Sequence, residues 1–193
     1  MSGCACLGKI FLIPVALFLL GAFVLALLGG WQRAPRRPPA PLWAQVFIKD
    51  MGMAIAEFHK AYHRLPLHEP VSAHEDTRLR SSGTWLAELL NDPGSTLNSK
   101  RLVFISPVMA NEGKNGLLQK DGAWVLVDPW GEPYYLIFDT NNDGMVSHLE
   151  FSTTQNISSP PLPQHLRPGS VIIYSAGPDR DPGTWEDNIR NWE

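Results

Sequence analysis

Cysteine is almost absent from this sequence. Its 193 residues include only Cys4 and Cys6, and both precede a long apolar run. The remainder of the chain therefore has no thiol, which excludes disulfide bonds and thiolate metal sites within it. A Cys-x-Cys pair beside an apolar segment is either two incidental small residues or a site of acylation.

A strong charge of either sign is also missing, and so are the short motifs of common enzymes. The chain has 16 Lys and Arg against 19 Asp and Glu, a net charge of -3, with no long basic run. This balance gives no electrostatic footprint for nucleic acid. There is no Gly-rich phosphate loop, no Gly-x-Ser-x-Gly turn and no convincing nucleophile–base pair. We therefore expect no nucleic-acid partner and no enzymatic activity.

One histidine pair is the only feature that favours an enzyme. His59 and His63 are four residues apart on a predicted helix, a spacing that can bind zinc. The His-Glu-x-x-His motif of zinc proteases also needs a glutamate, and Lys60 occupies that position. We expect two exposed histidines on a polar helix face.

Charge is absent from one long stretch near the start of the sequence. The 21 residues from Ile10 to Gly30 contain no charged side chain, and about 20 apolar residues span a bilayer core. A signal peptide normally has an apolar region of only about 7–15 residues, so we predict an uncleaved transmembrane helix. Arg33, Arg36 and Arg37 follow it, and the positive-inside rule alone would place the rest of the chain in the cytoplasm.

The predicted organisation has four parts. A tail at residues 1–9 precedes the transmembrane helix at 10–30, a Pro/Arg-rich linker occupies 31–41, and a globular domain occupies 42–193. The density of proline in the linker favours extended geometry.

Apolar spacing predicts the secondary structure of the globular domain. Leu42 to Tyr62 has the period of an amphipathic helix, with Phe47, Met51, Ala54, Phe58 and Tyr62 on one face. Trp85 to Leu90 is predicted as a short second helix. Short apolar runs bounded by turn residues predict strands at Leu102–Ile105, Trp124–Val127, Tyr134–Phe138 and Val171–Tyr174. The order predicts an α+β domain, in which the long amphipathic helix packs on a small antiparallel sheet.

Residues 139–150, reading DTNNDGMVSHLE, match the EF-hand calcium-loop pattern. Their predicted ligands are the side chains of Asp139, Asn141 and Asp143, the carbonyl of Met145, a water held by Ser147, and a bidentate Glu150. An EF-hand needs a helix on each side, however, and a strand is predicted before this loop. The alternative is an Asn/Asp/Gly-rich turn that closes a β-hairpin.

A second acidic loop lies near the end of the sequence. Its candidate oxygen ligands are Ser175, Asp179, Asp181, Glu186, Asp187 and Asn188. Calcium takes six to eight oxygens of this kind, whereas a solvated loop with Asp-capped turns needs the same residue types. Composition leaves both interpretations open.

Several segments together resemble the major pseudopilin of type II secretion systems, in the type IV pilin-like family. The end of the long helix and its exit, Tyr62-His63-Arg64-Leu65-Pro66, resemble the family's helix exit. The string Asp128-Pro129-Trp130-Gly131-Glu132-Pro133-Tyr134 is similar to the family's DPWGxPY signature. The tail, Ser175-x-Gly177-x-Asp179 followed by Ile189-x-Asn191-Trp192, resembles the family's closing loop. The resemblance covers residues 42–192.

The resemblance implies a pilin-like fold and a structural role in a type II secretion or type IV pilus-like system. It implies a single-pass protein of a bacterial inner membrane with a periplasmic domain, whose partners are the lipid bilayer and other pseudopilin-like subunits or secretion-system proteins. It also implies a calcium ion in the closing loop. Ser175 and Asp179 match the family pattern, Glu186 and Asn188 match its acidic positions, and Asp187 is an additional carboxylate. Arg180 stands where the family has glycine, and Asn188 where it has aspartate.

The front of the chain departs from the family. Gly8 is followed by Lys9, and Ile13 occupies the position of the glutamate in the prepilin peptidase site. The resemblance therefore describes a pseudopilin-like domain on an ordinary membrane anchor. The alternative interpretation is a membrane-tethered EF-hand-type calcium-binding module without a filament role.

Overall fold

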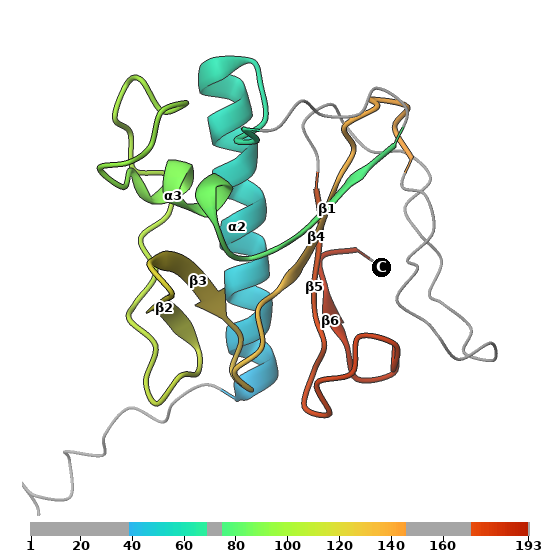
Figure 1. Cartoon of the computed structure of the whole chain (residues 1–193). Helices are drawn as coiled ribbons and strands as arrows, with labels where there is room; N and C mark the ends of the chain where they lie inside the picture. The colour runs from blue at the N-terminus through green and yellow to red at the C-terminus, as the bar shows by residue number, and fades with distance from the viewer. Residues whose placement is uncertain (1–38, 69–74, 146–170, 193) are drawn as a thin grey trace, which may run out of the picture. The chain divides into compact units, whose positions relative to one another are not determined.

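The computed structural model describes residues 39–68, 75–145 and 171–192. In chain order these residues form helix α2 (Ala40–Tyr62), strand β1 (Thr77–Arg80), helix α3 (Thr84–Leu90), β2 (Gly116–Lys120), β3 (Ala123–Val127), β4 (Tyr135–Phe138), β5 (Val171–Ser175) and β6 (Ile189–Arg190). Figure 1 shows α2 as the central long helix, with α3 and the β2–β3 hairpin to its left and the larger sheet to its right. The predicted α+β class is confirmed.

Helix α2 confirms the amphipathic pattern of the sequence. Phe47, Met51, Ala54 and Phe58 are buried as predicted. The helix begins at Ala40 and has a proline in its first turn. Proline is tolerated there because the N–H that it lacks would have no helical partner. The last two residues of the predicted linker are therefore helical. It ends where His63 takes a left-handed conformation (φ 52°) and its N–H donates to the carbonyl of His59.

The larger sheet is antiparallel with strand order β1-β4-β5-β6. Tyr135 on β4 lies opposite Tyr174 on β5, and Tyr174 lies opposite Arg190 on β6. Every residue of β4 and β5 is buried. Alternate residues, among them Leu136 and Ile173, belong to the main core with α2. The intervening positions face a second apolar cluster on the other side of the sheet.

That second cluster is mainly aromatic, and it explains how the sheet is covered on both faces. It contains Tyr135, Ile137, Ile172, Tyr174, Ala176, Trp185 and Trp192. The rings of Tyr135 and Tyr174 stack with centroids 4.8 Å apart, and Trp185 and Trp192 both contact Tyr174. The closing segment after β5 therefore contributes to the core.

One predicted strand is wrong, and three strands were not predicted. Leu102–Ile105 joins no sheet, because the N–H groups of Phe104 and Ile105 both donate to one carbonyl at the end of α3, that of Leu89. Strands β1, β2 and β6 were missed. They are short, and β1 and β2 include polar or charged residues that carry little apolar alternation.

Among the residues that the structure describes, no helix is long and apolar enough to cross a membrane. The predicted span at Ile10–Gly30 lies outside those residues.

Candidate functional site

The DPWGEPY segment forms a turn organised by one buried carboxylate. Asp128 is fully buried (0 % exposed). Its Oδ1 accepts hydrogen bonds from the backbone N–H groups of Trp130, Gly131 and Glu132, at 2.8–2.9 Å. Gly131 has φ 100°, which favours glycine. The main-chain donors of the turn thus satisfy the buried carboxylate, which offsets the free-energy cost of removing it from water.

The other oxygen of Asp128 joins this turn to the closing loop. Ser175 Oγ donates to Asp128 Oδ2 at 2.6 Å, and the same Oγ accepts the N–H of Gly177 at 3.1 Å. Both Asp128 and Ser175 are 0 % exposed. Two motifs that are 47 positions apart are therefore one hydrogen-bonded unit. The hydroxyl of Ser175 thus donates to Asp128 and accepts from Gly177, which leaves one lone pair of its oxygen for a further partner.

The closing loop folds back on itself between Gly177 and Asp187. A Cβ at Gly177, where φ is 71°, would lie 2.5 Å from the carbonyl oxygen of Asp187. The exposed Asp179 accepts the N–H of Asp181, and Asp181 accepts that of Gly183, each at 2.9 Å. These two contacts are the Asp-capped turns that composition alone allowed.

Two oxygens in the same loop are buried without a hydrogen-bond partner among the described residues. They are Oδ1 of Asp187 and Oδ1 of Asn188. Asn188 is 7 % exposed, and its Nδ2 donates to the carbonyl of Pro182 at 3.0 Å, which aims Oδ1 away from that contact. An unpaired buried acceptor costs about 1–3 kcal/mol. A cation or an ordered water is the kind of partner that would satisfy each of these oxygens. The predicted ligand Glu186 is exposed.

The described part of the EF-hand-like loop begins directly after β4. Asp139 is 1 % exposed, its Oδ2 accepts the N–H of Gly144 at 3.1 Å, and its Oδ1 has no hydrogen-bond partner in the described chain. Burial raises the pKa of Asp139, and the negative charges of Asp143 and Asp76 raise it further against the hydrogen bond from Gly144. A cation would relieve this repulsion.

The next residues of that loop form tight Asx turns. Asn141 Oδ1 accepts the N–H of Asp143 at 3.1 Å, and Asp143 Oδ1 accepts the N–H of Met145 at 2.8 Å. The strand before Asp139 is confirmed, so a helix does not precede the loop as it does in an EF-hand. Ser147 and Glu150 lie outside the described residues.

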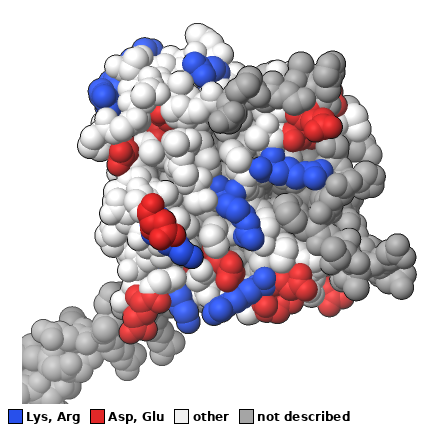
Figure 2. Space-filling view, viewed as in Figure 1, with Lys and Arg blue, Asp and Glu red and all other residues white. Residues whose placement is uncertain are grey.

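No group of three or more His, Cys, Asp or Glu residues within the described ranges is placed to hold a metal ion. A calcium ion at the closing loop, whose residues are all described, would draw on amide and carbonyl oxygens as well as carboxylates. His63 caps the C-terminal end of α2, where its backbone N–H donates to the carbonyl of His59. Figure 2 shows Lys and Arg side chains interspersed with Asp and Glu on the face in view.

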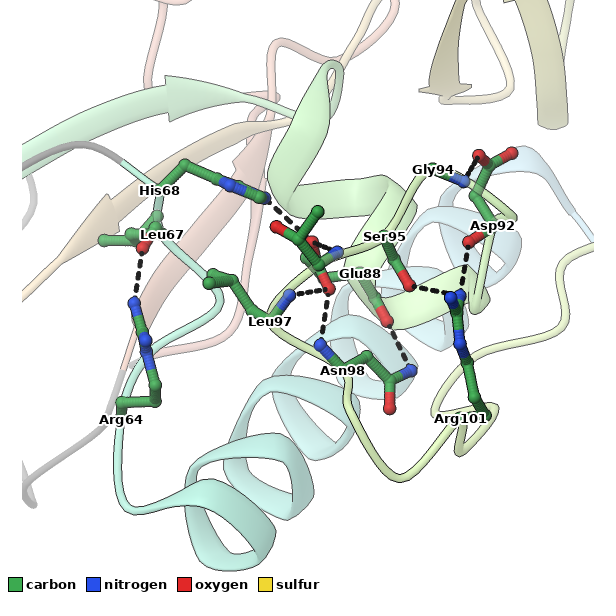
Figure 3. A network of polar contacts seen from close by, with 11 residues as sticks. Arg64, Leu67, His68, Glu88, Asp92, Gly94, Ser95, Leu97, Asn98 and Arg101 are labelled. Atoms are coloured by element: carbon green, nitrogen blue, oxygen red, sulfur yellow. Dashed lines mark hydrogen bonds and ion pairs between the residues drawn. The ribbon is translucent and has the colours of Figure 1, made fainter.

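A polar network around Glu88 was not anticipated from the sequence (Figure 3). Glu88 is 0 % exposed although it lies on the short helix α3. Its Oε1 accepts the N–H of Thr96 and contacts His68 Nε2, both at 2.8 Å. Its Oε2 accepts the N–H groups of Leu97 and Asn98. Burial alone would raise the pKa of Glu88, but the three N–H donors and His68 together hold it below its usual value.

Asn98 extends this network to the end of the long helix. Its Nδ2 donates to the carbonyls of Glu88 and Leu102, and its Oδ1 accepts the hydroxyl of Tyr62 at 2.6 Å. The only sequence signal was a polar run after a helix, which usually denotes a solvated loop. The network fixes the loop that follows α3 against α2.

Asn191 in the Asn-Trp tail has a structural role that spacing could not reveal. Its Oδ1 accepts the N–H of Ile173 and its Nδ2 donates to the carbonyl of Val171. The side-chain amide thus continues the ladder of β5 beyond the two-residue strand β6. This holds the tail where Trp192 enters the aromatic cluster.

Comparison with protein-family models, with curated proteins and with solved structures finds no match to this chain.

Proposed function

We propose that this chain is a membrane-anchored, pseudopilin-like structural or assembly protein, and not an enzyme. One observation carries the proposal. The two most specific matched motifs, the DPWGEPY turn and the closing loop, meet through the hydrogen bond of Ser175 to Asp128. Both motifs are built around main-chain contacts and leave no nucleophile in a reactive arrangement. A long helix on an antiparallel sheet is the architecture that such a subunit needs.

We infer that the protein is held in a bacterial inner membrane by residues 10–30, with residues 42–193 in the periplasm. A cysteine introduced at the exposed Asp121, in a variant with Cys4 and Cys6 changed to serine, tests this. Labelling by a membrane-impermeant maleimide in intact spheroplasts is the expected result. Labelling only after lysis would place the domain in the cytoplasm, as the positive-inside rule alone predicts. Extraction by alkaline carbonate, which leaves integral membrane proteins in the pellet, tests the anchor separately.

Calcium is the proposed ligand, and the closing loop is its first candidate site. Support comes from the buried, unpartnered Oδ1 atoms of Asp187 and Asn188 in the described chain. A ligand that binds only the native state stabilises it by about 2.7 kcal/mol at a hundredfold excess over its dissociation constant. For a domain of this size, that corresponds to a rise of roughly 5–10 °C in melting temperature. Melting with calcium and with a chelator measures it.

The EF-hand-like loop favours a second candidate function, a membrane-tethered calcium-binding module without a filament role. The observation behind it is the buried carboxylate of Asp139, whose Oδ1 lacks a hydrogen-bond partner in the described chain. Two variants separate the sites. Loss of the calcium effect in Glu150→Gln assigns the ion to the loop after β4, and loss in Asp179→Ala assigns it to the closing loop. Retention in both would sink both calcium sites.

A further inference from the structure

A groove runs along α2 on the side that faces the segment between α3 and β2. Its volume is about 350 Å³, and it is lined by α2 between Trp43 and Glu57 and by residues 104–108. Figure 1 shows the chain passing beside α2 on its way from α3 to the β2–β3 hairpin. Ligand pockets in proteins are typically about 300–1,000 Å³. We call this hollow the α2 groove.

The floor of the α2 groove belongs to the core. Phe47 and Ile105, which both line it, are 5 % and 7 % exposed. The ring of Phe104 lies 5.2 Å from that of Phe58, and the N–H of Phe104 donates to the carbonyl of Leu89 at 2.9 Å. The groove is therefore held in shape by the fold. A preformed surface avoids the entropy loss that a mobile one incurs on binding.

The rim of the α2 groove is apolar and open to solvent. Val46, Met53 and Val108 line it and are 41 %, 51 % and 61 % exposed. Trp43 and Pro107 add an indole and a proline ring to the lining. Exposed apolar side chains gathered around a hollow are typical of an interaction site.

Two carboxylates give the α2 groove its charge. Asp50 and Glu57 line it, and none of the described residues in its lining is basic. Glu57 does form an ion pair with Lys60 at 3.6 Å, but both side chains are largely exposed, and such pairs contribute little. Seven positions are two helical turns, or about 10.5 Å along the axis. The groove therefore favours a partner with two cations at about this separation.

A segment in polyproline II conformation fits this spacing. It rises about 3.1 Å per residue with three residues per turn, so side chains three positions apart lie about 9 Å apart on the same side. In a β-strand, side chains three positions apart point to opposite faces. Grooves lined by aromatic rings are the surfaces on which proline-rich segments dock. Such a segment has no internal hydrogen bonds, and Trp43 and Ser106 supply donors of the kind that its carbonyls need.

We propose that the α2 groove binds a proline-rich segment of another protein, with two arginines three positions apart facing Asp50 and Glu57. Arginine suits the groove better than lysine, because its guanidinium pairs with carboxylates and also stacks on aromatic rings. The partner loses little entropy, since proline fixes its conformation before it binds. This binding depends neither on calcium nor on a role in secretion.

Fluorescence anisotropy of the full-length chain in an uncharged detergent tests the proposal. The probe is a fluorescein-labelled peptide, Pro-Pro-Arg-Pro-Pro-Arg-Pro-Pro. Residues 32–41 of the chain contain the same residue types, so the assay uses a background with Arg33, Arg36 and Arg37 changed to glutamine. We expect saturable binding of this peptide and none of the same peptide with glutamate in place of both arginines. Absence of saturable binding by the arginine peptide would overturn the proposal.

Removal of the two carboxylates locates the cation contacts. Asp50→Asn combined with Glu57→Gln should weaken binding of the peptide about tenfold, as expected for the loss of two partly exposed charge pairs. The matched control is Glu112→Gln combined with Asp121→Asn, which removes two exposed carboxylates outside the groove. Equal affinities of the two double variants would show that Asp50 and Glu57 do not select the partner.

A pair of lysine substitutions tests the place of binding without disturbing the core. Val108→Lys puts a cation on the wall of the groove and should weaken binding by about tenfold or more. Val103→Lys is the control, because Val103 is similarly exposed (58 %) and does not line the groove. Equal affinities would overturn the site. Tighter binding of a helical peptide with arginines seven positions apart, which have the same spacing, would overturn the polyproline II assignment.

Discussion

Replacing the buried Glu88 by glutamine tests whether its carboxylate organises the loop after α3. The side chain keeps its size but loses its charge and gains an N–H₂ group. In the wild type, Oε1 and Oε2 together accept three backbone N–H groups. In glutamine an NH₂ group replaces one of these two oxygens, so its hydrogens point at a backbone N–H donor. Either orientation leaves at least one buried donor unsatisfied.

The expected loss follows from those contacts. Hydrogen bonds to a charged group contribute about 1.5–3 kcal/mol, and an unsatisfied buried group costs about 1–3 kcal/mol. Because glutamine retains part of the network, we expect Glu88→Gln to lose about 3 kcal/mol. For a domain of this size, the melting temperature should fall by roughly 6–12 °C at neutral pH. Glu57→Gln is the control, since Glu57 is exposed and should change little.

The pH dependence gives an independent check. The pKa of Glu88 is lowered in the folded state, so its contribution is complete above its ordinary value near 4.5 and is lost as the pH falls through the lower folded value. The difference between wild type and Glu88→Gln should therefore shrink below about pH 4.5. Differential scanning calorimetry of the full-length chain from pH 7 to pH 3 measures it. A difference that matches Glu57→Gln, or that does not shrink in acid, would refute the reasoning.

Three further substitutions probe the core and the closing loop. Gly177→Ala should destabilise the domain by roughly 2–4 kcal/mol, because the new Cβ would meet the Asp187 carbonyl at a residue with left-handed backbone. Chemical denaturation measures the change, and a neutral effect would contradict the loop geometry. Ser175→Ala should lower the free energy of unfolding by about 2–3 kcal/mol, since it removes the donor to the buried Asp128. Unchanged stability would contradict the proposed link between the two motifs. Phe58→Ala should cost about 3–5 kcal/mol, and a loss under 1 kcal/mol would contradict its place in the core.

The sequence predicted the elements whose local pattern and tertiary environment agree. Helix α2 has a sustained period of 3.6, and β4 and β5 are unbroken apolar runs because both of their faces are buried. Strand β1 could not be predicted from its sequence, TRLR, which is typical of an edge strand and has little apolar alternation. Only its pairing with β4 defines it as a strand. Leu102–Ile105 has the composition of a strand, but the carbonyl of Leu89 captures two of its N–H groups.

The candidate site was predictable in its residue types and not in its contacts. Asp128 was identified as part of a turn, whereas its hydrogen bond to Ser175 joins positions that local patterns cannot relate. Ser175 was predicted as a calcium ligand, and the sequence did not reveal that its hydroxyl also donates to Asp128. Glu88 was overlooked, because a glutamate on a short helix is almost always exposed unless it is paired.

Hydrogen bonds within the protein anchor the closing loop at both ends. At its start, Ser175 is bound to Asp128, and at its end, Asn191 extends the ladder of β5. Within the closing loop, two side-chain oxygens between these anchors are buried without a partner in the described chain, Oδ1 of Asp187 and Oδ1 of Asn188. A cation there would neutralise charge and stiffen the middle of a loop whose ends already belong to the core. Calcium would therefore add to the stability that these two anchors give the closing loop.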